Sequence, residues 1–310
     1  MAAWDRGRDS SVPSRRRLSI GGVGALVTCG QAELVPPPSE AYEHFLDEGP
    51  LSGLARAGCI EVKVLVGAPT APRGDLVFDT GTNWSAYSEP NGGYRLVFTA
   101  RDGSEWMQVI CDALTSNVAA HVARSLVSAN GTLDDPFCYP LDQLLLMNHL
   151  ASRQGFIVHA AGLRSANGVL AFCGVSGAGK TTISRLLGAA GKEPDVLSDD
   201  RLIIRAGEGG FDAWGTPWPG EARIARNESA PLRALVFLAK AAENRVIPLE
   251  PGVAARRLAP MVSCPWYDRQ RMPEVLDTCA HLVESVPGYE LQFVPDASVV
   301  ELLTQYFGGT

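Results

Sequence analysis

Apolar and polar residues alternate with a period of two over much of the chain between Leu18 and Gly131. Such alternation predicts strands that bury one face. The clearest runs are Ala25–Cys29, Ile60–Val66, Tyr94–Ala100 and Glu105–Cys111. The Asp102-Gly103 pair between the last two runs predicts a tight hairpin. One helix is expected among these strands, over Ser39–Asp47. We therefore predict a β-rich N-terminal region over residues 18–135, whose role the pattern does not reveal.

The pattern changes after Ser128–Pro136, a polar stretch with glycine and proline that is typical of a linker. Pro140 at a first turn and the apolar spacing that follows predict a helix that stops before Gly155. Further helices are expected over Pro251–Val262, over Arg271–Ser285 and from Asp296 to near Phe307. Short apolar runs predict buried strands at Val169–Cys173 and Ala234–Ala239, and a late strand is expected at Tyr289–Val294. Residues 136–310 are thus predicted to form an α/β domain, and residues 1–17 a disordered tail.

The composition is that of a globular protein, with 46% hydrophobic and 20% charged residues in 310. The net charge of -7 leaves no basic excess to neutralise phosphates, so we expect no nucleic-acid partner. No apolar run reaches the roughly 18 residues that a membrane span needs. The seven cysteines are scattered singly, which favours a reduced, cytoplasmic protein over a disulfide or zinc framework. Cys173 is expected to be a small buried apolar residue.

The stretch VLAFCGVSGAGKTTISRLL, Val169–Leu187, fits the phosphate-binding pattern G-x-x-x-x-G-K-[ST] between an apolar strand and a helix. Glycines let successive backbone N–H groups surround a phosphate chain, and the helix adds its positive N-terminal end. Lys180 would bind the β- and γ-phosphates, and the Thr181 hydroxyl would bind Mg²⁺. We expect a nucleoside triphosphate, ATP rather than GTP only because ATP is the commoner choice. The predicted binding residues are Gly174, Val175, Ser176, Gly177, Ala178, Gly179, Lys180, Thr181 and Thr182.

Phosphoryl transfer also needs a carboxylate for the metal and a group that orients or deprotonates the acceptor. Asp199 and Asp200 lie between two apolar runs in DVLSDDRLIIR, Asp195–Arg205. Neighbouring residues of a strand point to opposite faces, so the pair is predicted on a turn or bulge where both can approach one site. One acid would bind Mg²⁺ and the other would accept the hydroxyl proton, without a sequence reason to say which. A polar turn without chemistry is the alternative.

His159 in FIVHAAGL is the second candidate, although a histidine in so apolar a run is usually a core residue. VHAAG, GVSGAGKTT and LSDDRLII resemble, in order and spacing, the catalytic core of the HPr kinase/phosphorylase family. The phosphate loop and acid pair are also similar to those of ATP-dependent phosphoenolpyruvate carboxykinase, which shares that fold. The resemblance covers Phe156–Arg205. It implies that Lys180 and Thr181 bind triphosphate and Mg²⁺, that Asp199 and Asp200 share metal and base duty, and that His159 lies beside the acceptor or metal.

The chain also departs from the patterns of both families that it resembles. It is too short for a full carboxykinase, and the arginine-containing C-terminal signature of HPr kinases is replaced by GTPWPGEARIARN, Gly215–Asn227. Arg223 or Arg226 in this segment could reach a γ-phosphate, or either could be a solvated surface arginine. We therefore predict a kinase that acts on a serine-type hydroxyl of a protein, a peptide or a small molecule.

The alternatives are a nucleotide-binding regulatory module without turnover and a carboxykinase-like or small-metabolite kinase. A homo-oligomer is implied by the resemblance alone, since HPr kinases are hexameric.

Overall fold

The computed structural model describes residues 13–35, 40–49, 58–165, 167–175, 177–191 and 196–308, and they form a mixed α/β structure in two compact units. The described part of the first unit spans 13–18, 24–35, 48–49 and 58–141. The second unit holds 19–23, 40–47 and the described residues of 142–308. The unit boundary thus falls at Leu141, just inside the helix that the sequence predicts after Pro140. Two short N-terminal segments group with the second unit.

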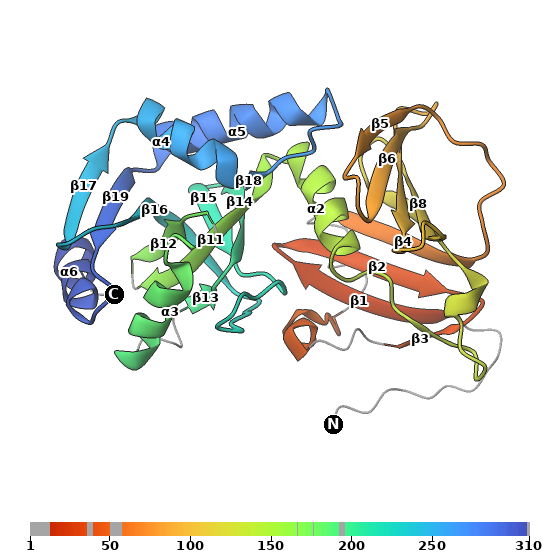
Figure 1. The fold of residues 1–310 in the computed structure, drawn as a ribbon, viewed down its shortest axis with the longest axis horizontal. Helices are drawn as coiled ribbons and strands as arrows, with labels where there is room; N and C mark the ends of the chain where they lie inside the picture. Colours follow the sequence, from red (N-terminus) through yellow and green to blue (C-terminus); the bar gives the residue numbers. More distant parts are fainter. Residues whose placement is uncertain are drawn as a thin grey trace. The chain divides into compact units, whose positions relative to one another are not determined.

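The first unit is built on strands (Figure 1). Among the described residues, eight strands form one sheet, in the spatial order β1 (Ser14–Ile20), β2 (Val23–Cys29), β4 (Cys59–Val66), β9 (Asn117–Val122), β8 (Glu105–Cys111), β7 (Tyr94–Thr99), β6 (Trp84–Ser88) and β5 (Leu76–Asp79). Strands β5 to β9 are antiparallel neighbours in chain order, whereas β4 runs parallel to both β2 and β9. A short helix, η2 (Arg124–Leu126), follows β9. The β-rich N-terminal region and the hairpin turn at Asp102-Gly103 are confirmed.

The predicted tail and linker are both wrong in part. Ser14–Arg17 belong to β1, so the tail prediction does not hold for them, and residues 1–12 lie outside the described residues. The strand turns every second side chain inward, which buries Arg16; its Nε lies 2.5 Å from Asp135 Oδ2. Within the predicted linker, β10 (Thr132–Asp134) pairs in parallel with β3 (Glu33–Val35). Arg15, Arg16 and Arg17 are thus strand residues, and Arg16 has a buried partner.

The helix predicted over Ser39–Asp47 is a 3₁₀ helix, η1 (Glu40–Phe45), and Ser39 lies outside the described residues. Its two buried residues are Tyr42 and Phe45, three positions apart. A 3₁₀ helix has three residues per turn, so this spacing places both on the same face. The predicted helical segment is therefore present among the described residues, as a 3₁₀ helix.

The second unit consists of two sheets that share two long strands. Its strands are β11 (Gly155–Ser165), β12 (Gly168–Cys173), β13 (Val196–Ser198), β14 (Arg201–Gly207), β15 (Gly210–Trp214), β16 (Ser229–Lys240), β17 (Arg245–Leu249), β18 (Val262–Ser263) and β19 (Gly288–Phe293). The first half of β11 pairs with β14, and its second half pairs with β12. Likewise β16 pairs first with β15 and then with β12 and β19, both in parallel.

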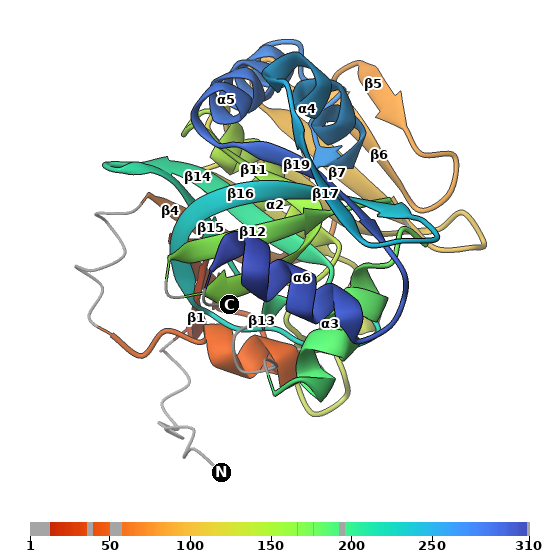
Figure 2. The ribbon, with the colours of Figure 1, turned by 90° about the vertical axis from the view of Figure 1, so that its left-hand side faces the viewer.

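Helices cover both faces of these strands (Figures 1 and 2). Helices α4 (Pro251–Leu258) and α5 (Arg271–Ser285) lie on one side, while α3 (Lys180–Ala189) and α6 (Ser298–Phe307) lie on the other. The other helical segments among the described residues of this unit are α2 (Leu141–Ala151), which starts next to Pro140 as predicted, and η4 (Ala259–Met261). None of the helices in the described part of the chain is long and apolar enough to cross a membrane.

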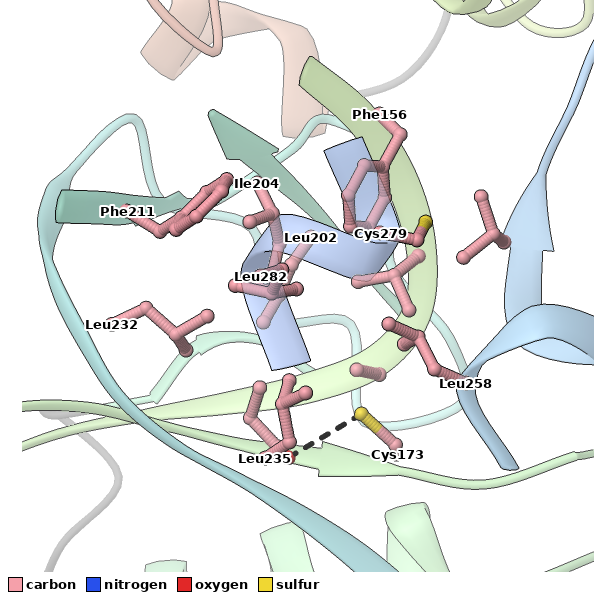
Figure 3. Packing of buried hydrophobic residues seen from close by; sticks show 14 of the residues in the cluster. Phe156, Cys173, Leu202, Ile204, Phe211, Leu232, Leu235, Leu258, Cys279 and Leu282 are labelled. Carbon is pink, nitrogen blue, oxygen red and sulfur yellow. Dashed lines mark hydrogen bonds between the residues drawn. The ribbon is translucent and has the colours of Figure 1, made fainter. Parts of the chain in front are cut away.

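Each face of the strands has its own hydrophobic core. Figure 3 shows the core under α4 and α5, where Leu258, Cys279 and Leu282 of the helices meet strand residues such as Phe156 and Leu202. The core on the other face joins α3 and α6 to β12, β16 and β19. Cys173 is fully buried, and burial raises its thiol pKa to about 12, so it stays neutral as a small apolar residue, as predicted. None of the seven cysteines, all of which lie among the described residues, forms a disulfide.

Leu282 on α5 gives a direct test of this packing. The Leu282→Ala variant should lose about 2–5 kcal/mol of unfolding free energy, because it leaves a cavity in a core where the side chain is 0% exposed. Leu276 on the same helix is 43% exposed, and Leu276→Ala should change stability by only about 0.5 kcal/mol. Urea unfolding of both variants measures the difference; equal losses would contradict the assigned helix face.

Candidate functional site

The segment Gly174–Gly179 joins β12 to α3 as the phosphate-binding pattern requires, and Ser176 within it lies outside the described residues. Gly177 has φ +79° and Gly179 φ +113°, both in the left-handed region that favours glycine. A Cβ atom on Gly179 would lie 2.6 Å from Phe293 Cζ, whereas one on Gly177 would meet no atom within 4 Å. Gly179 is therefore needed for close packing against β19. Gly177 leaves the space in front of the loop open.

Lys180 is buried at the start of α3, and its side chain turns back over the loop. Its Nζ donates to the Gly174 carbonyl at 2.7 Å and to the Val175 carbonyl at 3.5 Å. Burial lowers the pKa of Lys180, and the negative charge of Asp200 opposes that effect in part. Thr181 and Thr182 are half-buried in the first turn of the helix. The lysine, the loop and Asp200 thus belong to one electrostatic environment.

Strand β11 brings the three separate sequence elements together at His159. In the pairing with β14, His159 lies opposite Arg201, which directly follows the two aspartates. In the pairing with β12, the next residue, Ala160, lies opposite Cys173 at the start of the phosphate loop. The N–H of Gly174 also donates to the His159 carbonyl at 3.5 Å. His159 therefore occupies the point where β11 leaves one sheet and enters the other.

Asp200 forms a polar cluster with His159 and Arg201. Its Oδ1 lies 2.7 Å from His159 Nε2, and its Oδ2 accepts a hydrogen bond from Arg201 Nη1 at 2.6 Å. The side chains of His159 and Asp200 are 30% and 20% exposed, so the cluster is accessible. Burial raises the pKa of Asp200, but the hydrogen bond from His159 and the charges of Arg201, His159 and Lys180 outweigh burial and hold the pKa below its usual range. Asp200 is consequently an accessible carboxylate that stays ionised.

Asp199 has a different environment, although the predicted turn between two strands is present. It is only 1% exposed. Its Oδ1 accepts the N–H groups of Gly220 at 2.9 Å and Ile224 at 3.2 Å, and its Oδ2 accepts that of Ala222 at 2.7 Å. The prediction that both carboxylates face one site is therefore wrong for Asp199 in this structure. Three backbone donors satisfy the buried charge and hold it inside the protein.

The residues that bind Asp199 belong to a loop, residues 215–227, in which the sequence pointed only to the two arginines, Arg223 and Arg226. Gly220 passes so close that a Cβ atom there would lie 2.9 Å from Asp199 Oδ2. Trp218 Nε1 donates at 2.8 Å to Oδ2 of buried Asp142, which also accepts the Tyr42 hydroxyl at 2.6 Å. The loop is thus fixed at two buried carboxylates. Sequence patterns gave no signal for Asp142, because its partners are distant in the chain.

The two arginines of this loop are held differently. Arg223 is exposed and has φ +57°, an uncommon conformation for a residue with a side chain. Arg226 is half-buried, and its N–H donates to the Leu197 carbonyl at 2.9 Å. The structure thus distinguishes two residues that the sequence left equivalent.

Comparison with known families adds one match. The family model described as SynChlorMet cassette protein ScmC matches residues 141–295, half of the chain. The chain belongs to the ScmC family. The match to ScmC begins at α2 and ends just after β19, so it contains the phosphate-binding loop, His159, the acid pair and the loop of residues 215–227. A comparison with curated proteins gave no match.

The two aspartates should respond differently to the same substitution. Asp199→Asn places an amide NH₂ among three N–H donors and should cost about 2 kcal/mol of unfolding free energy. Asp200→Asn affects a partly exposed cluster and should cost about 1 kcal/mol or less. Chemical denaturation of the two variants tests this order, and a more stable Asp199→Asn protein would contradict it.

The acid stability of the protein should depend on Asp200. Because its pKa is lower in the folded than in the unfolded protein, its interactions add stability above the unfolded value of about 4 and lose it as the pH falls through the folded value. The stability difference between wild type and Asp200→Asn should therefore shrink as the pH is lowered below about 4. Unfolding curves between neutral and acidic pH measure this; a difference that grows in acid would contradict the assignment.

Proposed function

We propose that this chain is an ATP-dependent kinase that transfers the γ-phosphoryl group to a serine-type hydroxyl. The observation that carries the proposal is the position of His159 on β11, opposite Arg201 on one side and next to the start of the phosphate loop on the other. This register gathers a phosphate loop, a lysine and an ionised carboxylate within one α/β unit. These are the parts that phosphoryl transfer needs. The resemblance of Phe156–Arg205 to the HPr kinase/phosphorylase core, and to the fold of phosphoenolpyruvate carboxykinase, supports the same reaction.

The nucleotide would bind in front of Gly174–Gly179. The open space at Gly177 gives a phosphate room to approach the loop backbone, and the N-terminus of α3 favours negative charge there. Lys180 would exchange its bonds to the Gly174 and Val175 carbonyls for bonds to phosphate oxygens. Such an exchange replaces neutral acceptors by charged ones, which makes stronger hydrogen bonds to an ammonium group.

The residues fit Mg²⁺ that arrives with the nucleotide. The described residues contain no cluster of three or more His, Cys, Asp or Glu side chains that could bind a metal. Mg²⁺ is commonly held by only one or two carboxylates together with substrate phosphates, which a single accessible acid can provide. Asp200 and the Thr181 hydroxyl would hold the ion, and Mg²⁺ would neutralise charge on the phosphates. The low pKa of Asp200 suits a metal ligand better than a base.

His159 would then be the general base that accepts the proton of the acceptor's hydroxyl group. It is 30% exposed and hydrogen-bonded to Asp200, which fixes the orientation of its ring. Imidazole is the side chain most often used in general acid–base catalysis. Arg201 holds Asp200 from the other side, so that the carboxylate keeps its position when His159 moves a proton. In this assignment Asp199 takes no direct part, because its oxygens are occupied by backbone donors.

The acceptor is a protein, a peptide or a small molecule that carries a hydroxyl group. The family description, a cassette protein, supports an acceptor that is encoded alongside the kinase. Labelled ATP and Mg²⁺ with the separately purified products of the neighbouring genes would identify the acceptor, and label on a metabolite from extract would instead indicate a small-metabolite kinase.

One observation favours a second function, a nucleotide-binding regulatory module without turnover. Lys180 is satisfied by loop carbonyls and only one acid of the pair is accessible, so the unit has fewer free catalytic groups than the sequence predicted. Such a module would bind the nucleotide and change the affinity of a partner. Stoichiometric ATP binding without hydrolysis or transfer to any fraction would support it against the kinase.

Lys180→Ala provides the test of nucleotide binding. The substitution removes the cation at the phosphates and should weaken Mg·ATP binding by about 10- to 100-fold, with activity falling in parallel. Lys240→Ala, at the end of β16 and outside the loop, is the control and should bind as wild type. Calorimetric titration measures both. Unchanged ATP affinity in Lys180→Ala would reject the phosphate-loop assignment and the kinase with it.

A further inference from the structure

The loop of residues 215–227 has an unusual local arrangement at Arg223. The two residues that flank it, Ala222 and Ile224, both donate their backbone N–H groups to Asp199, one to each carboxylate oxygen. The Arg223 N–H itself donates to the Gly220 carbonyl at 3.2 Å. Three successive N–H groups are thus fixed by Asp199 and by the turn that begins at Gly220. The backbone between these anchors is held with Arg223 in the left-handed region, φ +57°.

This conformation has an energetic cost that the chain could easily avoid. A glycine adopts the left-handed region readily, and the chain has glycine at most of its positive-φ positions. Among the described residues, non-glycine side chains with positive φ occur only at Thr115, Gln154 and Arg223. Strained residues persist where surrounding structure holds them, and they cluster at functional sites. An exposed arginine held in such a position is therefore a candidate functional residue.

The position of the loop relates Arg223 to the nucleotide. Asp199, which holds its neighbours, is next in sequence to Asp200, and the charges of both acids act on Lys180 of the phosphate loop. Gly220 packs against both acids, since a Cβ there would lie 2.9 Å from Asp199 Oδ2 and 3.1 Å from Asp200 Cβ. The turn that carries Arg223 therefore begins in contact with both acids and is bound to Asp199 on either side of the arginine. A guanidinium group there is suited to bind phosphate oxygens through two parallel bonds.

From these contacts we propose that Asp199 is a positioning residue, which fixes Arg223 so that its guanidinium group binds the terminal phosphate of the triphosphate. Asp199 acts only through the loop, by holding the N–H groups of residues 220, 222 and 224. Arg223 is the residue that touches the ligand. The inference rests on the proposed function, and it gives the two aspartates separate roles. Asp200 binds Mg²⁺ and orients His159, whereas Asp199 positions Arg223.

The test compares a non-hydrolysable ATP analogue with ADP, each with Mg²⁺, by calorimetric titration of the full chain. Arg223→Gly should weaken the ATP analogue by about tenfold or more and leave ADP unchanged, because only the analogue has the terminal phosphate. The same substitution should also make the protein as stable as wild type or more so, since glycine adopts φ +57° without strain. Arg223→Lys should retain part of the preference, because it keeps the charge without the fork.

Asp199→Asn should weaken the ATP analogue in the same selective way. When Asp199→Asn is combined with Arg223→Gly, the affinity for the ATP analogue should fall little further, because both substitutions remove the same contact, that of Arg223 with the terminal phosphate. Gln154→Gly is the matched control: it relieves a similar conformation, φ +50°, in the turn before β11, and should change neither affinity. If Asp199→Asn does not fold, the Arg223 variants test the proposal by themselves.

The outcomes separate this inference from the function on which it rests. Wild-type protein that binds neither nucleotide overturns both. If the wild-type protein binds both nucleotides and the Arg223→Gly variant keeps the full preference for the ATP analogue, only the role of Arg223 is overturned. The positioning role is overturned if Asp199→Asn weakens the binding of ADP and of the analogue equally. It is also overturned if the loss of affinity for the analogue in Asp199→Asn adds fully to the loss in Arg223→Gly. Selective, non-additive loss supports it.

Discussion

The candidate site depends on the fact that β11 is paired along both edges and changes partner in the middle. Up to His159 it pairs with β14, and from Ala160 it pairs with β12. Hydrogen-bond ladders fix register because a slip by one residue would turn every side chain to the other face. The phosphate loop and the acid pair start at the ends of these two ladders. Their separation is therefore set by backbone pairing within a buried strand, and not by the side chains of the site.

The two acids illustrate how one turn can give adjacent, identical residues opposite environments. Asp200 remains accessible between His159 and Arg201, whereas Asp199 is enclosed by three backbone N–H groups. A buried carboxylate must have such partners, because an unpaired charge away from water is very costly. Asp199 and the loop of residues 215–227 therefore depend on each other: the loop satisfies the charge, and the charge gives the loop its shape. The buried Asp142 likewise accepts hydrogen bonds from Trp218 and Tyr42 and so holds both side chains.

The family match begins at Leu141, where the boundary between the two units falls. It covers residues 141–295, which include α2, β11, β16, the phosphate-binding loop, His159, the acid pair and the loop of residues 215–227. The helices on the two faces, α4 with α5 and α3 with α6, bury separate cores and leave the strand ends to the loops. Rigid strands beneath irregular loops are a common basis for a binding site, since the scaffold fixes positions that the loops alone would not hold.

The sequence by itself determined the local elements of the site. Glycine spacing and apolar runs predicted the strand, loop and helix around Lys180, and period-two alternation predicted the β-rich N-terminal region, because these signals act between near neighbours. It also placed Asp199 and Asp200 on a turn. Only the tertiary structure decided that Asp199 is enclosed, that Arg223 is held by it, and that Arg16 is a buried strand residue rather than part of a tail. Each of these depends on a partner 20 or more residues away, as in the bond from Ile224 to Asp199 or the pair of Arg16 with Asp135, and no periodicity in the sequence encodes such a pairing.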